Sequence, residues 1–150
     1  MDAFMQAALE QAHQGLEEGG IPIGAALVAG GRIVSRGRNR RCQQGSAILH
    51  AEMDALERAG RRPASFYAGA TLYTTLSPCS MCAGAALLYG IPQIVIGENR
   101  NFCGEERLLR ARGIGVEVLD AADCINLMAD FIAAQPQLWH EDISRDPPLG

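Results

Sequence analysis

Two short stretches of the chain carry the residue types of a metal site. Cys79 and Cys82 stand three positions apart, where a turn is expected to lead into a helix. Residues at i and i+3 share one face of a helix, so both sulfur atoms can point toward one metal ion. Pro78 suits a helix entrance, and a helix N-terminus favours the thiolate over the thiol. A Cys-x-x-Cys pair alone is also compatible with a redox pair or with half of a structural zinc site.

The second stretch, His50-Ala51-Glu52, decides among these alternatives. His50, Cys79 and Cys82 supply three protein ligands and leave a fourth position open, which is typical of catalytic rather than structural zinc. Residues at i and i+2 do not share a helix face, so Glu52 can stand beside the metal without binding it. A carboxylate in that place is suited to proton transfer. We therefore predict one zinc ion per chain and assign Glu52 as the acid–base group.

The surrounding sequence predicts the elements that must position these residues. Asp2 is a plausible N-cap for a first helix, which Gly19-Gly20 ends. Gly30-Gly31 predicts a tight turn between two antiparallel strands. A polar loop is expected at 39–46 and a short tail at 137–143. The expected strands are 23–29, 32–38, 70–75, 93–97 and 116–119, and the later helices are 50–59, 79–89, 105–112 and 121–134.

A hairpin followed by alternating strands and helices predicts one α/β domain over residues 1–150. Its fold class is a three-layer α-β-α sandwich with a mixed five-stranded sheet. The crossovers make the later strands parallel, and chemistry is expected at their C-terminal ends. His50 and Cys79 each begin a helix at that end of the sheet. The two helix starts can therefore converge.

Composition narrows the classes of function. The net charge of −4 argues against a nucleic-acid partner, which usually requires a basic surface. No apolar run approaches membrane-spanning length, and the first residues lack a signal-peptide pattern, so a cytoplasmic location is expected. The chain has five cysteines, an odd number, and no export signal. We therefore expect all five to be reduced thiols. Cys42, Cys103 and Cys124 have no partner at ligand spacing and are expected to be small buried hydrophobes, although Cys103 adjoins Phe102 in a loop that could approach the pocket.

Several further segments carry a family resemblance beyond the two metal motifs. They are 20–24, Gly37-Arg38-Asn39, Gly45-Ser46-Ala47, 72–79, 89–92, Gly97-Glu98-Asn99, Asn101-Phe102 and 139–143. With them, the chain resembles the fungal-type cytosine deaminases of the cytidine deaminase superfamily over most of its length. The combination of H-x-E with P-C-x-x-C is itself the signature of zinc-dependent nucleobase deaminases.

The resemblance implies a sheet of the cytidine deaminase type and hydrolytic deamination of free cytosine to uracil and ammonia. Zinc-activated hydroxide would attack C4 of the ring, with Glu52 as proton shuttle. The resemblance further implies a homodimer, with 79–89 and the loop near Asn101 at its interface, a role in pyrimidine salvage, and residues 137–150 as a tail that closes the active site. The substrate contacts it implies are the Ala51 amide, the Ser77 carbonyl, Asn39 and Asp142 on the pyrimidine edge, and Phe102 and Trp139 as aromatic walls.

Each substrate contact also has a simpler interpretation. Asn39 could be a turn asparagine, Trp139 a core-capping aromatic residue and Asp142 an exposed tail charge. Two departures from the family pattern bear on the choice of base. Ala51 stands where the fungal enzymes are expected to have glycine, and His140 replaces an aromatic residue.

Other deaminases remain as alternatives. His50-Ala51-Glu52-Met53 and residues 78–85 also resemble tRNA adenosine deaminases, which need a basic channel. Arginines 36, 38, 40 and 41 could supply part of one, or could form a solvated strand edge. A folded-down tail would leave no room for ribose, which favours a free base. Guanine or a modified pyrimidine remains a closer alternative. A non-catalytic zinc module would predict a missing Glu52 or a fourth protein ligand, and neither is evident.

Overall fold

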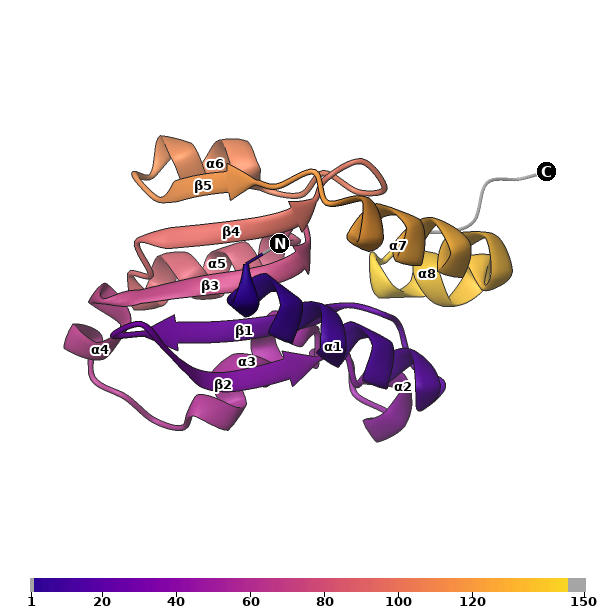
Figure 1. Cartoon of the computed structure of the whole chain (residues 1–150), viewed down its shortest axis with the longest axis horizontal. Coiled ribbons are helices and arrows are strands. Elements are labelled where there is room, and N and C mark those ends of the chain that lie inside the picture. Colours follow the sequence, from indigo (N-terminus) through magenta and orange to yellow (C-terminus); the bar gives the residue numbers. More distant parts are fainter. Residues whose placement is uncertain (1, 146–150) are drawn as a thin grey trace.

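A five-stranded mixed sheet forms the centre of the computed structural model, which describes residues 2–145 (Figure 1). Its strand order is β2-β1-β3-β4-β5. β1 pairs antiparallel with β2 and β3, whereas β3, β4 and β5 are parallel. The strands are β1 (Gly24–Ala29), β2 (Arg32–Arg38), β3 (Ala70–Leu76), β4 (Gln93–Glu98) and β5 (Gly115–Val118). The predicted hairpin is confirmed, because Gly30 and Gly31 both have positive φ, +60° and +72°, as its tight turn requires.

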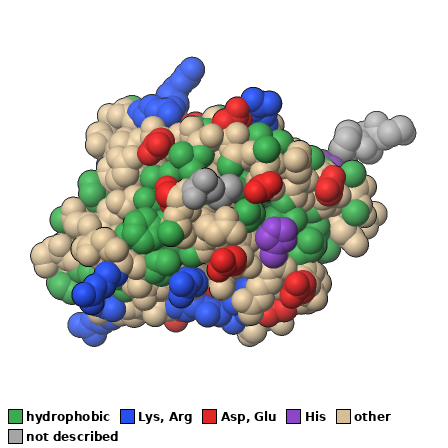
Figure 2. All heavy atoms as spheres, viewed as in Figure 1, with side chains coloured by type: hydrophobic (Ala, Val, Ile, Leu, Met, Phe, Trp, Pro, Cys, Tyr) green, Lys and Arg blue, Asp and Glu red, His purple; other side chains and the backbone are tan. Residues whose placement is uncertain are grey.

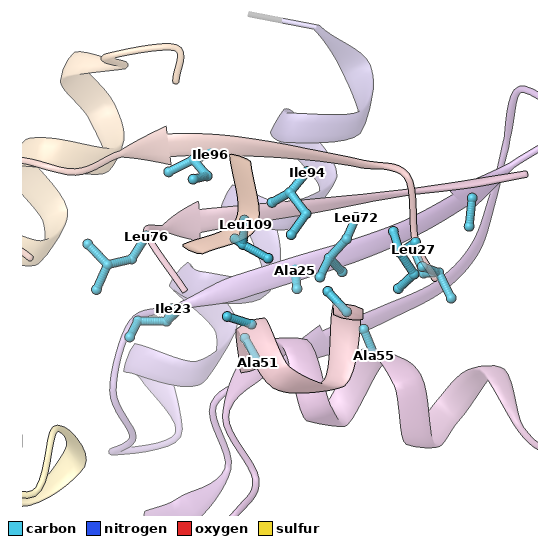
Figure 3. Packing of buried hydrophobic residues seen from close by; sticks show 14 of the residues in the cluster. Ile23, Ala25, Leu27, Ala51, Ala55, Leu72, Leu76, Ile94, Ile96 and Leu109 are labelled. Carbon is cyan, nitrogen blue, oxygen red and sulfur yellow. The ribbon is translucent and has the colours of Figure 1, made fainter. Parts of the chain in front are cut away.

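Helices cover both faces of this sheet. α1 (Ala3–Glu17) packs on one face, where Met5, Ala8 and Leu9 form a small core with Val95 of β4. α3 (Ala51–Ala59) and α5 (Ser80–Tyr89) cover the opposite face and contribute to the larger core (Figure 3). The larger core includes Ala25, Leu27, Ala51, Ala55, Leu72, Ala83, Ala86, Ile94 and Leu109. The predicted three-layer sandwich is therefore confirmed.

The last two helices of the chain lie beyond the C-terminal ends of β3, β4 and β5. α6 (Glu106–Ala111) precedes β5, and α7 (Ala122–Ala134) with α8 (Pro136–Asp142) lies past the strand arrowheads in Figure 1. This arrangement brings α8, which belongs to the predicted tail, to the edge of the sheet where α3 and α5 begin. Residues 146–150 of that tail lie outside the described residues.

Three short helices differ from the prediction. α2 (Arg41–Gln44) lies within the expected polar loop, and α4 (Ala64–Ala68) occupies a stretch for which no element was predicted. α8 spans most of the expected short tail, for which no helix was predicted. These helices have four to seven residues, too few to show helical periodicity. The predicted N-cap of α1 is confirmed, because the Asp2 carboxylate accepts hydrogen bonds from Phe4 N at 2.9 Å and Met5 N at 2.8 Å. No helix among residues 2–145 has both the length and the apolar character needed to cross a membrane.

Two glycines let the helices approach the sheet closely. A Cβ atom at Gly24 would overlap the backbone of α1 at Ala8, and one at Gly37 would overlap the backbone of α3 at Ala51 and Ala55. Backbone atoms cannot move aside as a flexible side chain can. α3 therefore lies directly against β2, and its first residues are held in a defined position at the end of the sheet.

Gly37→Ala should lower the free energy of unfolding by about 1–3 kcal/mol, because the added methyl group must push α3 away from the sheet. Urea unfolding followed by circular dichroism, with excess zinc present, measures this change. Gly69→Ala is the control, because the nearest atom to its Cβ would be Phe66 O at an ordinary 3.8 Å. Equal stability of the two variants would contradict the close approach of α3.

Candidate active site

Three potential metal ligands meet at the starts of α3 and α5. His50 is the N-cap of α3 and Cys79 is the N-cap of α5, and neither side chain caps its own helix. Both side chains are therefore available to face each other. His50 Nδ1 lies 3.4 Å from Cys79 Sγ and 3.8 Å from Cys82 Sγ. All three ligand atoms lie within 4.8 Å of one another.

The separations suit a tetrahedral zinc ion. Zinc–nitrogen and zinc–sulfur distances of about 2.0–2.3 Å correspond to about 3.3–3.8 Å between neighbouring ligand atoms in a tetrahedron. The distances from His50 Nδ1 to the two sulfur atoms fall in that range. The predicted convergence of the two helix starts is thus confirmed, and the donor set fits the predicted ion.

The three ligand side chains also influence one another's protonation. The hydrogen bond from Cys82 lowers the pKa of the Cys79 thiol to about 4, whereas the hydrogen bond to Cys79 raises the pKa of Cys82. Burial lowers the pKa of His50, but hydrogen bonds with Asp142 and Cys79 outweigh it and raise that pKa to about 10. Since metals bind neutral imidazole and thiolate, loading of this site would release protons to solvent.

Glu52 stands beside the ligand cluster, in the wall of a pocket that also exposes His50 and Cys79. The residue is only 4 % exposed. Burial raises the pKa of its carboxyl, because the ionised form loses its contact with water. A carboxyl group in such surroundings can hold a proton more readily than one in water. The proton-shuttle role of Glu52 itself stays a prediction.

Asp142 connects the C-terminal helix to this cluster. Its Oδ1 lies 3.2 Å from His50 Nε2 and accepts a hydrogen bond of 2.8 Å from Asn39 Nδ2. A carboxylate on the second ring nitrogen of a metal-binding histidine fixes the orientation of the ring. Asp142 is buried, so its interpretation as an exposed tail charge is wrong. The simpler interpretation of Asn39 is incomplete, because its Oδ1 does accept from Arg41 N in a local turn while its amide nitrogen reaches Asp142.

The pocket above the ligand cluster has aromatic and aliphatic walls. The Phe102 and Trp139 rings meet edge to face, with centroids 5.9 Å apart. Asn39 and Ala51 are fully buried and lie behind the wall. Sequence reasoning missed three apolar wall residues, because apolar side chains at strand and helix ends look like core in a sequence. The wall consists of Ile23, His50, Glu52, Leu76, Ser77, Cys79, Phe102, Trp139, Asp142 and Ile143.

A buried carboxylate that sequence reasoning also missed holds the loop that carries Phe102. Glu106 Oε2 accepts a 2.6 Å hydrogen bond from Ser77 Oγ, and Ser77 Oγ accepts one of 2.9 Å from Gly104 N. Asn99 Nδ2 donates to Glu106 Oε1 at 3.2 Å. This network ties the loop to the end of β3. No short-range pattern in the sequence could show a link between Ser77 and Glu106.

The remaining cysteines do not all behave as expected. Cys124 is buried, as predicted, but Cys42 and Cys103 are exposed, so their assignment as buried hydrophobes is wrong. Cys42 lies on the short helix α2, which the sequence did not predict. Cys103 lies in the loop before α6, 3.7 Å from Glu106 Oε2. Neither belongs to the ligand cluster.

The fold and the His-Cys-Cys cluster together define the class of zinc-dependent deaminases, and comparison with known proteins agrees. Residues 1–98 match the family model described as the cytidine and deoxycytidylate deaminase zinc-binding region. The chain therefore belongs to this family. It is 53% identical to a cytosine deaminase of Candida albicans over 140 aligned residues. The aligned region covers 93% of each chain.

More distant relatives share the same architecture. The chain is 38% identical to a tRNA-specific adenosine deaminase of Streptococcus pyogenes serotype M18, over 85% of this chain and 87% of that one. Among solved structures, a guanine deaminase from Nitrosomonas europaea superimposes with a TM-score of 0.68 at 26% identity, covering 87% of this chain and 84% of that one. Proteins named for different substrates are thus similar to this chain in sequence or in fold.

Cys82→Ala should lower zinc affinity by more than about a hundredfold, because removing a direct ligand costs more than removing a residue that only supports one. Metal content after dialysis against a weak chelator, measured by mass spectrometry, reports the change. Cys103→Ser is the matched control and should keep one zinc per chain. Full zinc retention in Cys82→Ala would show that the ligand set is wrong.

Proposed function

We propose that this chain deaminates free cytosine to uracil and ammonia. The observation that carries the proposal is that Trp139 and Asp142 of α8 form a wall of the pocket directly beside His50. The pocket encloses little free space between these walls, which suits a small flat molecule better than a nucleoside or a polynucleotide. The identity of 53% to the Candida albicans cytosine deaminase supports the same choice of base.

His50, Cys79 and Cys82 would hold the zinc ion, which when bound supplies a Lewis acid that makes water nucleophilic near neutral pH. Glu52 would take a proton from the attacking water and deliver it to N3 of the ring. It would then carry the second proton to the departing amine. The C4–O bond forms, the C4–N bond breaks and ammonia leaves, so Glu52 ends as it began.

The rest of the pocket would select the base. Phe102 and Trp139 would flank the ring, whose flat faces suit aromatic side chains. Asp142 can accept hydrogen bonds from ring N–H groups, and Asn39 offers both a donor and an acceptor. Ala51 lies in the first turn of α3, where backbone N–H groups have no intrahelical partner and can hold substrate. The Ser77 carbonyl would face the reacting amino group.

Deamination of adenosine in tRNA is less well supported because the proposed basic channel is largely neutralised. Arg38 pairs with Glu18, Arg40 with Asp54, and Arg41 lies 3.7 Å from Asp142. The description as a solvated strand edge holds for Arg36, which is exposed on β2. It is wrong for Arg38, Arg40 and Arg41, whose side chains are only 12–23% exposed. On the face in Figure 2, basic side chains lie at the upper and lower margins with acidic side chains between them. Such a surface favours a small substrate over a polyanion.

The expected assembly, location and pathway also remain proposals. Leu88 of α5 is 77% exposed and Tyr89 is 41% exposed, which makes this helix end a suitable dimer surface. A cytoplasmic location is proposed because the sequence lacks a signal-peptide pattern and a membrane-spanning apolar run. A role in pyrimidine salvage follows from the resemblance and from the proposed substrate.

Purified zinc-loaded protein should release ammonia from cytosine, while cytidine, guanine, adenine and tRNA are inert or far slower. The pocket closed by α8 leaves little space for a ribose on the ring. An enzyme-coupled ammonia assay with equal substrate concentrations makes the comparison. Turnover of another base, with cytosine inert, would refute cytosine as the substrate and leave the zinc site in place.

Glu52→Gln should lower kcat by about 10³-fold, the usual contribution of a positioned acid–base group, while zinc content stays at one per chain. Glutamine has almost the same shape but cannot accept and return a proton. Glu57→Gln, which changes a carboxylate further along the same helix, is the control and should keep wild-type turnover. Full activity of Glu52→Gln would refute the shuttle.

Leu88→Glu should convert the proposed dimer to a monomer at micromolar concentration, because it places a charge on the most exposed apolar side chain of α5. Sedimentation velocity distinguishes the two species. Glu10→Gln on α1 is a suitable surface control. Sedimentation of the wild-type protein as a monomer would refute the proposed dimer.

A further inference from the structure

Asp54 is a fully buried carboxylate to which the proposed mechanism gives no role. It lies on α3, two residues after Glu52, and its side chain is 0% exposed. A buried charge is costly unless it is paired and hydrogen-bonded. Asp54 meets both conditions, but buried ion pairs are weak evidence for stability. The geometry of its partners is more informative.

The partners of Asp54 lie on both sides of Asn39. Asp54 Oδ2 accepts a hydrogen bond of 3.0 Å from Arg38 N, the residue before Asn39. Arg40 is the residue after Asn39. Its Nε and Nη2 donate hydrogen bonds of 3.1 Å and 2.9 Å to Asp54 Oδ1. One carboxylate on α3 thus fixes the chain immediately before and after a buried asparagine.

Asn39 in turn connects this segment to the pocket through its own hydrogen bonds. Its backbone N–H donates to Ile23 O at 3.0 Å, and its side-chain amide donates to Asp142 Oδ1 at 2.8 Å. Asp142 lines the pocket and lies 3.2 Å from His50 Nε2. His50 begins the same helix that carries Asp54. The contacts therefore close a ring from α3 through Arg38 and Arg40 to Asn39, Asp142 and back to the start of α3.

We propose that Asp54 is a positioning residue that sets the base-recognition side of the pocket relative to the metal-binding helix, acting through Arg38, Arg40 and Asn39. Without it, the segment 38–40 would keep its strand pairing but lose its direct attachment to α3. Asn39 would hold Asp142 less firmly, and α8 would be less tightly anchored. This inference rests on the proposed function only for the identity of the base.

The chain offers a matched pair of variants. Arg40 and Arg58 both contact the Asp54 carboxylate, but Arg40 follows Asn39, whereas Arg58 lies on α3 itself and its Nε is 3.2 Å from Oδ2. Arg40→Gln and Arg58→Gln each remove one positive charge beside the same group. Only the first breaks a link to Asn39. Asp54→Asn keeps the size of the side chain and weakens both links.

Two measurements on zinc-loaded protein, well below the unfolding temperature, separate positioning from bulk stability. The first is the steady-state KM and kcat for cytosine. The second is acrylamide quenching of Trp139, the only tryptophan of the chain, which lies on α8 and is 5% exposed. A loss of stability alone would change neither quantity in the folded protein.

Arg40→Gln and Asp54→Asn should raise KM about tenfold, as expected for the loss of one charge-assisted hydrogen bond, with kcat changed less than about threefold. Both should also increase the quenching of Trp139, while zinc content stays at one per chain. Arg58→Gln should match the wild type in KM and in quenching.

Unchanged KM and quenching in Arg40→Gln would overturn the proposal, as would equal effects in Arg40→Gln and Arg58→Gln. Should Asp54→Asn fail to fold, the arginine pair decides the question alone. Failure of the proposed function gives a different result, because the wild type would then not deaminate cytosine. The quenching comparison would still report whether Asp54 anchors α8.

Discussion

The starts of α3 and α5 must meet at one point, and most of the molecule serves that constraint. His50 and Cys79 are N-caps with extended backbone, so their side chains leave the helix axis and can face each other. That geometry holds only while both helices lie on the same face of the sheet at a fixed depth. Gly37 sets this depth for α3, because any side chain there would collide with the helix backbone. The larger hydrophobic core, which joins α3 and α5 to β1, β3 and β4, then fixes the two helices together.

The end of the sheet beyond β3 and β4 is unusually polar for a protein interior. Asn39, Glu52, Asp54, Ser77, Glu98, Glu106 and Asp142 are all buried. Most of them are hydrogen-bonded in ways that fix a loop or helix end, as when Glu98 accepts bonds from the backbone of Arg100 and Asn101. Satisfied polar networks of this kind specify one arrangement more strictly than apolar packing does. Glu52 differs, because its carboxyl faces a pocket and burial raises its pKa.

How much the sequence could predict depended on how local the signal was. The hairpin turn, the N-cap Asp2 and the five strands each have a pattern within a few residues, and the structure confirms them. The two short metal motifs are also local patterns, and the structure brings their His50, Cys79 and Cys82 together. The bond between Asn39 and Asp142 joins residues 103 positions apart, and only family resemblance could bring these two together. The partners of the arginines at 38, 40 and 41 were equally inaccessible, so these residues were misread as solvated. Cys42 and Cys103 were misplaced because burial depends on which way a short helix or loop turns.

The relatives of this chain suggest where selectivity for a base must reside. Proteins named as cytosine, guanine and tRNA adenosine deaminases resemble it in sequence or fold. A zinc site common to such a family supplies chemistry without choosing the base, so the choice must depend on other walls of the pocket. Here those walls are α8 and the loop that carries Phe102, each tied to the sheet by a buried carboxylate, Asp142 or Glu106. A carboxylate fixed by several donors resists displacement, and a rigid wall discriminates between bases better than one that adapts. If α8 and this loop select the base, as we propose, the hydrogen bonds behind the pocket matter to that choice as much as the side chains that line it.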